Sequence, residues 1–269
     1  IMKKIISIFF ITLLLIIISV VGILSTTGYE TDKFNNVIIK KINENNKNLN
    51  LELKKIKFKF DIKNFSLFLE TNKPSLNYKN LDIPIKKIKI YLDLVGLIKQ
   101  DNEINQIKII SGDLNINELK KIVLKTKPSN LNSFIINKVS KGNLKTEIEI
   151  FLDNNQNIQN FIAKGYVKEM EAKLNTDLYV KNTNFEFFAD ATDILIKNIN
   201  SQLDGISLKE GHLHINRGSK TKIKSDFNSE ININDTNLSK YSPFFNDINI
   251  TTENLNLTAD LKHFLDISF

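Results

Sequence analysis

An uncharged apolar run near the N-terminus, from Ile5 to Leu24, constrains this chain most. An α-helix of about 20 apolar residues crosses a hydrocarbon core of roughly 30 Å. Lys3 and Lys4 precede the run, and the long polar segment after it contains no second run of this kind. The sequence therefore predicts a single membrane anchor, residues 1–27, that holds one large extramembrane body.

A cleaved signal peptide is the alternative interpretation of this segment. Signal peptides have a shorter apolar core, of about 7–15 residues, and a small-x-small cleavage site. Here the run is longer, and the residues after it include Ser25 and Thr27 but no Ala-x-Ala cleavage site. We therefore favour an uncleaved anchor. The positive-inside bias keeps Lys3 and Lys4 in the cytoplasm, so we expect a single-pass protein of the bacterial inner membrane with a periplasmic body.

The composition limits the partners of this body. The chain of 269 residues has no cysteine, so neither a disulfide nor lipoprotein processing is available to it. Its formal net charge of +7 is typical of a solvated lysine face. In the alternative interpretation, this charge attracts the body to anionic lipid headgroups. The basic residues are scattered along the chain, and the body should lie across a membrane from the genome. We therefore expect no nucleic-acid partner.

Apolar side chains change their period shortly after the anchor. Phe34, Val37, Ile38 and Ile42 recur at helical spacing, which predicts a first helix that packs on a sheet or lies on the membrane surface. A period of two then begins, with a change of parity at Lys54–Lys55 that suggests a bulge or a turn. Such alternation predicts strands with one apolar and one lysine-rich face.

Further strands, a hairpin and two helices follow. The apolar residues from Ile83 to Leu94 predict one strand, and the residues on either side of Ser111-Gly112-Asp113 predict a hairpin around it. Helices are expected from Asn117 to about Leu124 and from Pro128 to Gly142. From residue 143 onward the pattern indicates strands only. We therefore divide the body into an α+β part, 28–142, and an antiparallel β-meander, 143–269, which we expect to continue beyond Phe269.

Only the few short helices before residue 145 could cover the apolar faces of these strands. A closed β-sandwich would use those faces up, whereas an open, curled sheet would leave an apolar trough that needs a ligand or a partner. Our predicted fold class is mainly β, with one N-terminal transmembrane helix. The body is expected to be an elongated, curled antiparallel sheet that forms a β-groove, with a few short helices near the N-terminal half.

The order of these elements resembles a known family. An anchor is followed by a helix like 34–42, short strands such as 58–62, the run 83–98 and a hairpin like 107–116. This order is similar to the start of AsmA-like proteins, the group of AsmA, TamB and YhdP, although those proteins are usually much longer. The resemblance implies an inner-membrane anchor, a hydrophobic β-groove, phospholipid transport between inner and outer membrane, and outer-membrane integrity.

A lipid groove needs a dry aliphatic and aromatic wall, which alternating strands supply without any catalytic residue. Ordinary core packing remains the alternative for each residue of such a wall. The candidates for the groove wall come from three predicted strands: Ile56, Phe58, Phe60, Ile62, Ile88, Ile90, Leu92, Ile148, Ile150 and Leu152.

No constellation in the sequence indicates catalysis, a metal site or a cofactor. His212 and His214 share one strand face but have no third ligand nearby in the chain, and Asp190 and Asp193 lie at a predicted turn. We therefore expect a lipid-binding protein that is not an enzyme. The alternative is an anchored assembly or scaffold protein that binds other envelope proteins.

Overall fold

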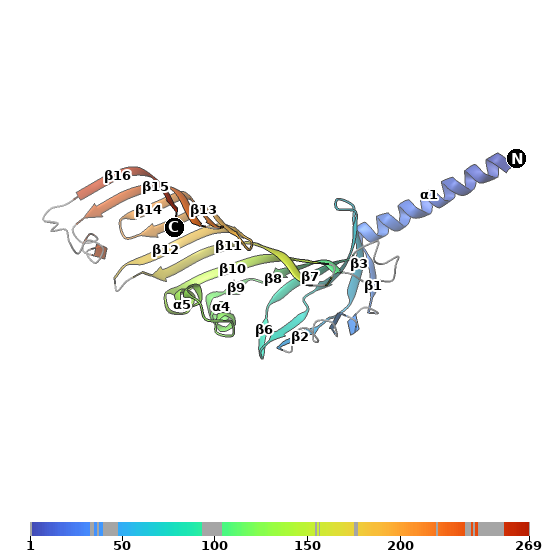
Figure 1. The fold of residues 1–269 in the computed structure, drawn as a ribbon, viewed down its shortest axis with the longest axis horizontal. Helices are drawn as coiled ribbons and strands as arrows, with labels where there is room; N and C mark the ends of the chain where they lie inside the picture. Colours follow the sequence, from blue (N-terminus) through green and yellow to red (C-terminus); the bar gives the residue numbers. More distant parts are fainter. Residues whose placement is uncertain are drawn as a thin grey trace. The chain divides into compact units, whose positions relative to one another are not determined.

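The structure is a computed structural model in which the fold is mainly β and antiparallel, with one long apolar helix at the N-terminus (Figure 1). The large sheet is not closed into a barrel. The chain forms two compact units: residues 1–110 with 149–160, and residues 111–148 with 161–269. The structure describes residues 2–32, 35–36, 38–39, 48–92, 104–153, 155, 157–174, 177–218, 220–234, 238, 240–241 and 256–268.

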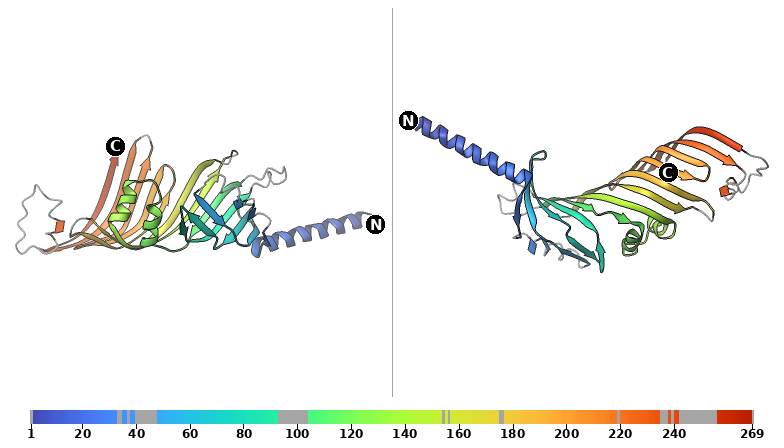
Figure 2. Two further views of the ribbon diagram at one scale, coloured as in Figure 1. Left: turned by 90° about the horizontal axis from the view of Figure 1, so that it is seen from below. Right: turned by 180° about the vertical axis from the view of Figure 1, so that it is seen from behind.

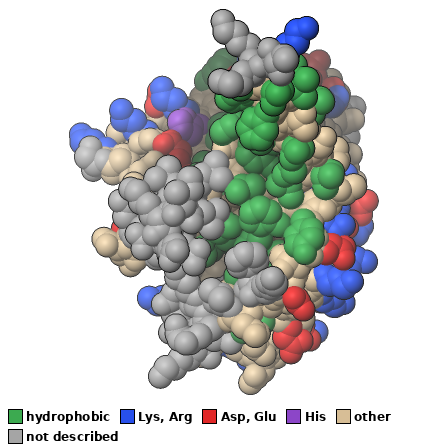
Figure 3. All heavy atoms as spheres, turned by 90° about the vertical axis from the view of Figure 1, so that its right-hand side faces the viewer, with side chains coloured by type: hydrophobic (Ala, Val, Ile, Leu, Met, Phe, Trp, Pro, Cys, Tyr) green, Lys and Arg blue, Asp and Glu red, His purple; other side chains and the backbone are tan. Residues whose placement is uncertain are grey.

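The predicted anchor is helix α1, Met2–Thr26. Its side chains from Lys4 to Val20 are all exposed, and the helix is long and apolar enough to cross a membrane. Gly28 ends it with φ 72° and donates its backbone N–H to the Ile23 carbonyl, 2.9 Å away. Figure 3 views the molecule from the end at which α1 projects and shows hydrophobic side chains gathered in one continuous area.

Unit 1 holds two antiparallel sheets. The pairing order in the larger one is β1-β3-β4-β7-β8, and in the smaller one β2-β5-β6. The strands are β1 (Tyr29–Thr31), β2 (Leu49–Glu52), β3 (Ile56–Asp61), β4 (Ser66–Asn72), β5 (Ser75–Tyr78), β6 (Leu81–Ile83), β7 (Ile85–Leu92) and β8 (Ile104–Ser111).

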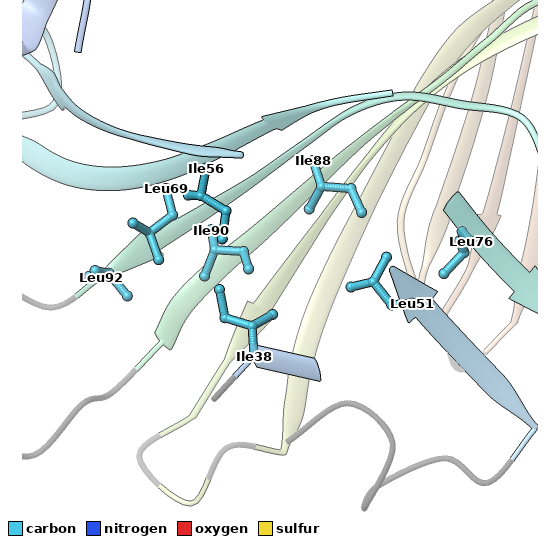
Figure 4. Packing of buried hydrophobic residues seen from close by; sticks show 8 residues of the cluster. All are labelled: Ile38, Leu51, Ile56, Leu69, Leu76, Ile88, Ile90 and Leu92. Atoms are coloured by element: carbon cyan, nitrogen blue, oxygen red, sulfur yellow. The ribbon is translucent and has the colours of Figure 1, made fainter. Parts of the chain in front are cut away.

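The core of unit 1 joins these two sheets. Leu51 of β2 and Ile56 of β3 are each 1% exposed. They belong to one apolar cluster with side chains of β4, β5 and β7 (Figure 4). Ile38 has a helical backbone and is also part of this cluster, so this residue of the predicted first helix packs on the sheet. The other residues of the predicted first-helix stripe (Phe34, Val37 and Ile42) lie outside the described residues.

The sequence analysis missed how often the chain changes sheets in unit 1. The parity change at Lys54–Lys55 is the connection from β2 in the small sheet to β3 in the large one. The single strand expected from Ile83 onward is two strands in different sheets, β6 and β7, which separate at Pro84. Strand β5 was not predicted. The segment from Val95 to Ile98 lies outside the described residues.

Unit 2 contains a long antiparallel meander. Strands β11 to β16 pair in sequence order, each with the next, and Figure 2 shows β12–β16 as a single layer. β10 and β11 are divided between the two units. The strands are β9 (Leu114–Asn115), β10 (Val139–Leu152), β11 (Ile158–Lys173), β12 (Tyr179–Ala189), β13 (Asp193–Leu203), β14 (Ile206–Arg217), β15 (Thr221–Asn234) and β16 (Asn256–Ser268).

Two short helices of unit 2 pack together at one end of the meander. α4 (Ile116–Val123) begins at a capping box, in which Asn115 and Glu118 bond each other's backbone N–H groups. α5 (Asn130–Asn137) begins at Ser129, as the sequence predicted. Ile116 and Ile135 pack in one cluster with Ala172 of β11. These helices therefore cover the apolar side of the sheet at that end.

Two expectations about this region were wrong. The second helix ends at Asn137, and Val139 and Gly142 belong to β10. The predicted hairpin around Ser111-Gly112-Asp113 does not form, because β9 pairs with β10 instead, with Leu114 opposite Leu144. Local alternation correctly marked the strand at residues 114–115, but its partner lies about 30 residues further along the chain, beyond the reach of local pattern reading.

Candidate functional site

The predicted groove residues occupy three environments. Ile56, Ile88, Ile90 and Leu92 are buried in the core of unit 1. Phe58 and Phe60 are half-buried, as are Ile148, Ile150 and Leu152, whereas Ile62 is 63% exposed. For the four buried residues the structure shows core packing between two sheets. A lipid site needs an apolar surface that remains accessible, and the meander of unit 2 provides one.

One face of the meander is apolar across its strands. Residues that oppose each other in an antiparallel sheet lie on the same face, so the registers of β12 to β15 align their apolar side chains in rows. Phe187 opposes Ile196, which opposes Leu213; Ile194 opposes Ile215, which opposes Ile223. The opposite face carries Lys197, His214, Lys224 and similar polar residues. We call the first of these the open face and define it by Phe187, Ile194, Ile196, Leu213, Ile215 and Ile223.

The side chains of the open face are half-buried. In the part of the chain that the structure describes, α4 and α5 cover the end at β11, and Tyr241 bonds the Asp204 carbonyl at the β13–β14 turn. Among the described residues, the buried cluster under α4 and α5 includes side chains of β10 and β11 only, and no buried hydrophobic cluster joins a helix or a second sheet to the rows from β12 to β15.

Two glycines in the sheet make room for aromatic rings on this side. A Cβ added to Gly211 would lie 2.3 Å from Phe227 Cδ1, and one added to Gly165 would lie 2.9 Å from Phe187 Cζ. A phenyl ring of the adjacent strand therefore occupies part of the space that a side chain at each glycine would need. At Gly165 the Lys145 carbonyl oxygen also occupies this space, 2.1 Å from the added Cβ.

We predict that Gly211→Ala lowers the free energy of unfolding by about 1–3 kcal/mol, because the new methyl group displaces the Phe227 ring. In a Phe227→Ala background the same change should cost markedly less, since the ring is gone. Chemical denaturation of the four proteins in this double-mutant cycle measures the coupling. Equal costs in both backgrounds would show that the ring does not rest on Gly211.

A line of β-bulges crosses four adjacent strands. Glu169, Asn182, Asn198 and Glu210 each have a positive φ, between 49° and 54°, at a register shift in β11, β12, β13 and β14 respectively. Each follows a lysine in the sequence (Lys168, Lys181, Lys197 and Lys209). β-bulges bend a strand and increase its twist. Bulges at neighbouring positions of four adjacent strands therefore bend the sheet along one line. The sequence analysis did not detect these bulges.

Two polar pairs interrupt the open face near this line. Thr183 Oγ1 lies 2.7 Å from Ser201 Oγ, and Ser229 Oγ lies 2.6 Å from His263 Nε2. Each pair satisfies its own hydrogen-bonding groups on a largely apolar surface, at little cost in desolvation. Ser229 and His263 resemble a nucleophile and a base. Within the described residues, no carboxylate bonds the His263 ring to orient it as a catalytic base.

The other histidines and acidic residues that the sequence analysis considered lie on the polar side. His214 Nε2 is 2.7 Å from Asp193 Oδ1, which also accepts a bond from Asn216. These two bonds hold the pKa of Asp193 below its ordinary value. Backbone N–H groups of Asp193 and Thr192 lower the pKa of Asp190 in the same way at the β12–β13 turn. These contacts build a solvated turn. In the described residues no group of three metal-ligating side chains comes together.

The open face is the most distinctive surface of the described structure, and the sequence analysis named none of its residues as groove wall. One signal was present: no predicted helix follows residue 145, so the later strands had nothing in the sequence to cover them. No family model, curated protein or solved structure matches the chain.

Proposed function

We propose that this chain is a membrane-anchored, AsmA-like protein that binds phospholipid acyl chains on the open face and conveys them between the inner and outer membranes. The observation that supports this proposal is the set of apolar rows from Phe187 to Ile223, which no buried hydrophobic cluster of the described residues joins to a helix or a second sheet. α1 would hold the protein in the inner membrane, with the body in the periplasm. The resemblance of the first 116 residues to AsmA-like proteins points the same way.

The dimensions of the open face suit a lipid tail. Strands in a sheet are about 4.8 Å apart. The row of Ile194, Ile215 and Ile223 continues to Ala189 of β12 and Ile267 of β16, so it crosses five strands and extends over about 19 Å. Half of a bilayer's hydrocarbon core is about 15 Å thick. One row of the open face is therefore long enough for an acyl chain that lies across the strands.

The chemistry of the open face suits a carrier. Each methylene group that leaves water contributes about 0.8 kcal/mol to binding. This attraction is non-directional, so a tail could move from one row to the next without breaking a specific bond. The open face supplies two neighbouring rows, and no covalent step is needed.

Site-specific photocrosslinking tests the proposal. We expect p-benzoylphenylalanine at Leu213 to form adducts with phosphate-labelled lipid in cells. The same probe at His212 or His214 should not, because these neighbours point to the polar side of the same strand. The comparison uses one strand and one distance from the anchor, so it separates the two faces of the sheet. Lipid adducts at all three positions, or at none, would contradict the proposal.

We also expect Leu213→Asp to remove lipid crosslinking from a probe at Ile196, the residue that it opposes. A carboxylate in the row must be desolvated when a tail binds, which costs far more than the lost methylene groups contribute. His212→Asp on the polar side is the matched control and should leave the adduct unchanged. Far-UV circular dichroism shows whether both variants keep the sheet.

The alternative, an anchored assembly protein, is favoured by one observation. Within the described residues β16 is the last strand of the pairing order, and its Leu261, Phe264 and Leu265 are 44%, 71% and 48% exposed. A strand edge of this length can accept a strand from a partner. Protein adducts instead of lipid adducts from the probe at Leu213 would support this alternative.

A further inference from the structure

The turn between β3 and β4 lies close to the end of the membrane helix. β1 follows α1 almost directly and pairs antiparallel with β3, with Tyr29 opposite Phe58. Residues after Phe58 therefore run back toward the anchor, and three residues bring Asp61 about 10 Å past Tyr29. α1 and β3 are in contact, and a Cβ on Gly28 would lie 2.7 Å from Lys59 Cγ.

Apolar side chains are exposed on this turn, residues 62–65. Ile62 is 63% exposed and Phe65 is 73% exposed, and the Phe65 ring touches Phe60 edge-on, with 5.3 Å between ring centroids. Tyr29, just after the helix, is 66% exposed. Three large side chains are therefore exposed near the end of α1. A position at the membrane surface explains their exposure, because tyrosine favours the headgroup level and large apolar side chains such as phenylalanine enter the boundary between headgroups and acyl chains.

Phe65 also has an unusual backbone conformation, with φ at 50°. A bulky side chain in the left-handed region is strained, and glycine or asparagine is the common choice there. The rest of the turn is well made: Asp61 Oδ1 accepts the backbone N–H groups of Lys63 and Asn64 at 3.0 and 3.3 Å. Glycine at position 65 would relieve this backbone strain but would lose the ring contact with Phe60. Most of the phenyl side chain nevertheless remains exposed, so its contact with Phe60 alone does not account for a large apolar residue at this position.

Basic side chains stand beside the apolar ones. Lys63 is exposed at the tip of the turn, whereas Lys59, on β3 next to Gly28, is 20% exposed and paired with Glu70. A lysine near an anionic leaflet contributes about 1 kcal/mol to attraction. The combination of exposed aromatic, aliphatic and basic groups beside a membrane helix matches the headgroup region of an anionic bilayer.

We propose that the β3–β4 turn is a second membrane contact, in which Ile62 and Phe65 enter the boundary between headgroups and acyl chains while Lys63 meets lipid phosphates. The occupant is the bilayer that α1 crosses, so this inference rests on the membrane-anchor part of the proposed function and is independent of lipid binding on the open face. Two contacts, the helix and the turn, would fix the orientation of unit 1 on the membrane. The helix alone would attach unit 1 at a single point and would leave it free to rotate.

The absence of tryptophan from the chain makes the test direct. Phe65→Trp places a single fluorophore on the turn of the full chain, reconstituted in vesicles of phosphatidylethanolamine and phosphatidylglycerol. Groups at the headgroup–acyl boundary lie about 5–10 Å into the bilayer surface. We expect blue-shifted emission, with stronger quenching by lipids brominated near the ester end than by lipids brominated near the bilayer centre. Acrylamide in the water should quench it weakly.

Two matched tryptophan variants separate the possible outcomes. Phe10→Trp reports on the middle of α1 and should be quenched most by deep bromine. Leu131→Trp, at a side chain 66% exposed on α5, should be quenched by acrylamide only. Quenching of Phe10→Trp without quenching of Phe65→Trp would overturn the membrane contact and leave the anchor intact. Loss of lipid quenching at Phe10→Trp would overturn the anchor, and with it both proposals.

Phe65→Gly distinguishes membrane contact from a structural role. This change relieves the positive φ, so the turn should remain folded. With Ile62→Trp as the reporter, Phe65→Gly should shift the emission to the red and increase acrylamide quenching in vesicles. Lys63→Glu should have the same effect in anionic vesicles and a smaller one in phosphatidylcholine alone. Unchanged emission in both variants would contradict the proposal.

Discussion

Leu51→Ala is expected to lower the free energy of unfolding of unit 1 by about 3 kcal/mol, within the range for buried leucines in well-packed cores. Leu51 is 1% exposed and belongs to the short strand β2, which holds the smaller sheet against the larger one. Its loss leaves a cavity that the neighbouring side chains can fill only in part. Because β2 is four residues long, few other contacts compensate.

Chemical denaturation of the full chain in a mild detergent, followed by far-UV circular dichroism, measures this effect. Leu131→Ala is the matched control, since its side chain is 66% exposed and surface changes usually stay within about 0.5 kcal/mol. A loss below about 1 kcal/mol for Leu51→Ala would show that the two sheets do not enclose this residue.

Glu70→Gln is expected to destabilise unit 1 by about 2 kcal/mol, because it leaves several lysines close together around a buried site. Glu70 is 4% exposed on β4, and its carboxylate lies 3.1 Å from Lys87 Nζ, 3.4 Å from Lys59 Nζ and 3.8 Å from Lys89 Nζ. The lysines remain partly exposed, which keeps the cost below that of a fully buried pair. Glu30→Gln is the matched control: Glu30 pairs with Lys55 and Lys57 at the surface, and exposed pairs contribute at most about 1 kcal/mol.

The pH dependence of stability gives a second measurement of the same site. Burial raises the pKa of Glu70, but the hydrogen bond from Lys87 and the charges of Lys87, Lys59 and Lys89 outweigh it, so the pKa lies below the ordinary 4.5. A depressed carboxylate pKa stabilises the fold above the ordinary pKa, and this contribution is lost as the pH falls through the folded-state pKa. The wild-type protein should therefore lose stability below about pH 4.5 more steeply than Glu70→Gln. Parallel pH profiles would contradict this role.

The strands and their two faces could be predicted from the sequence, because alternation is a local property. Local patterns predicted the anchor, the beginnings of α4 and α5, and the antiparallel strands after residue 143. They did not predict which strands pair with each other. β2 and β3 carry the same kind of alternation but join different sheets, and β9 pairs with β10, across two helices, rather than with β8, the strand directly before it. Strand pairing depends on contacts distant in the chain, which a local period does not encode.

The bulges show a second limit. Glu169 adopts a positive φ of 51° between Lys168 and Met170, with no glycine or asparagine beside it to mark the position. The register shift becomes visible only when the neighbouring strands are in place. Phe65 is similar: its exposure and its strain were invisible in a pattern that counted it simply as the first apolar residue of a strand.

By itself, the sequence determined that this chain has one membrane-spanning length of apolar helix and a body of strands with one apolar face each. The tertiary structure decided which of those faces are covered. Ile90 and Leu213 stand in equivalent alternating patterns, yet Ile90 is 4% exposed beneath a second sheet, whereas Leu213 lies on the open face. Alternation reports which side of a strand avoids water. What shields that side is set by elements far away in the chain, and only their packing shows where an apolar surface remains free to bind.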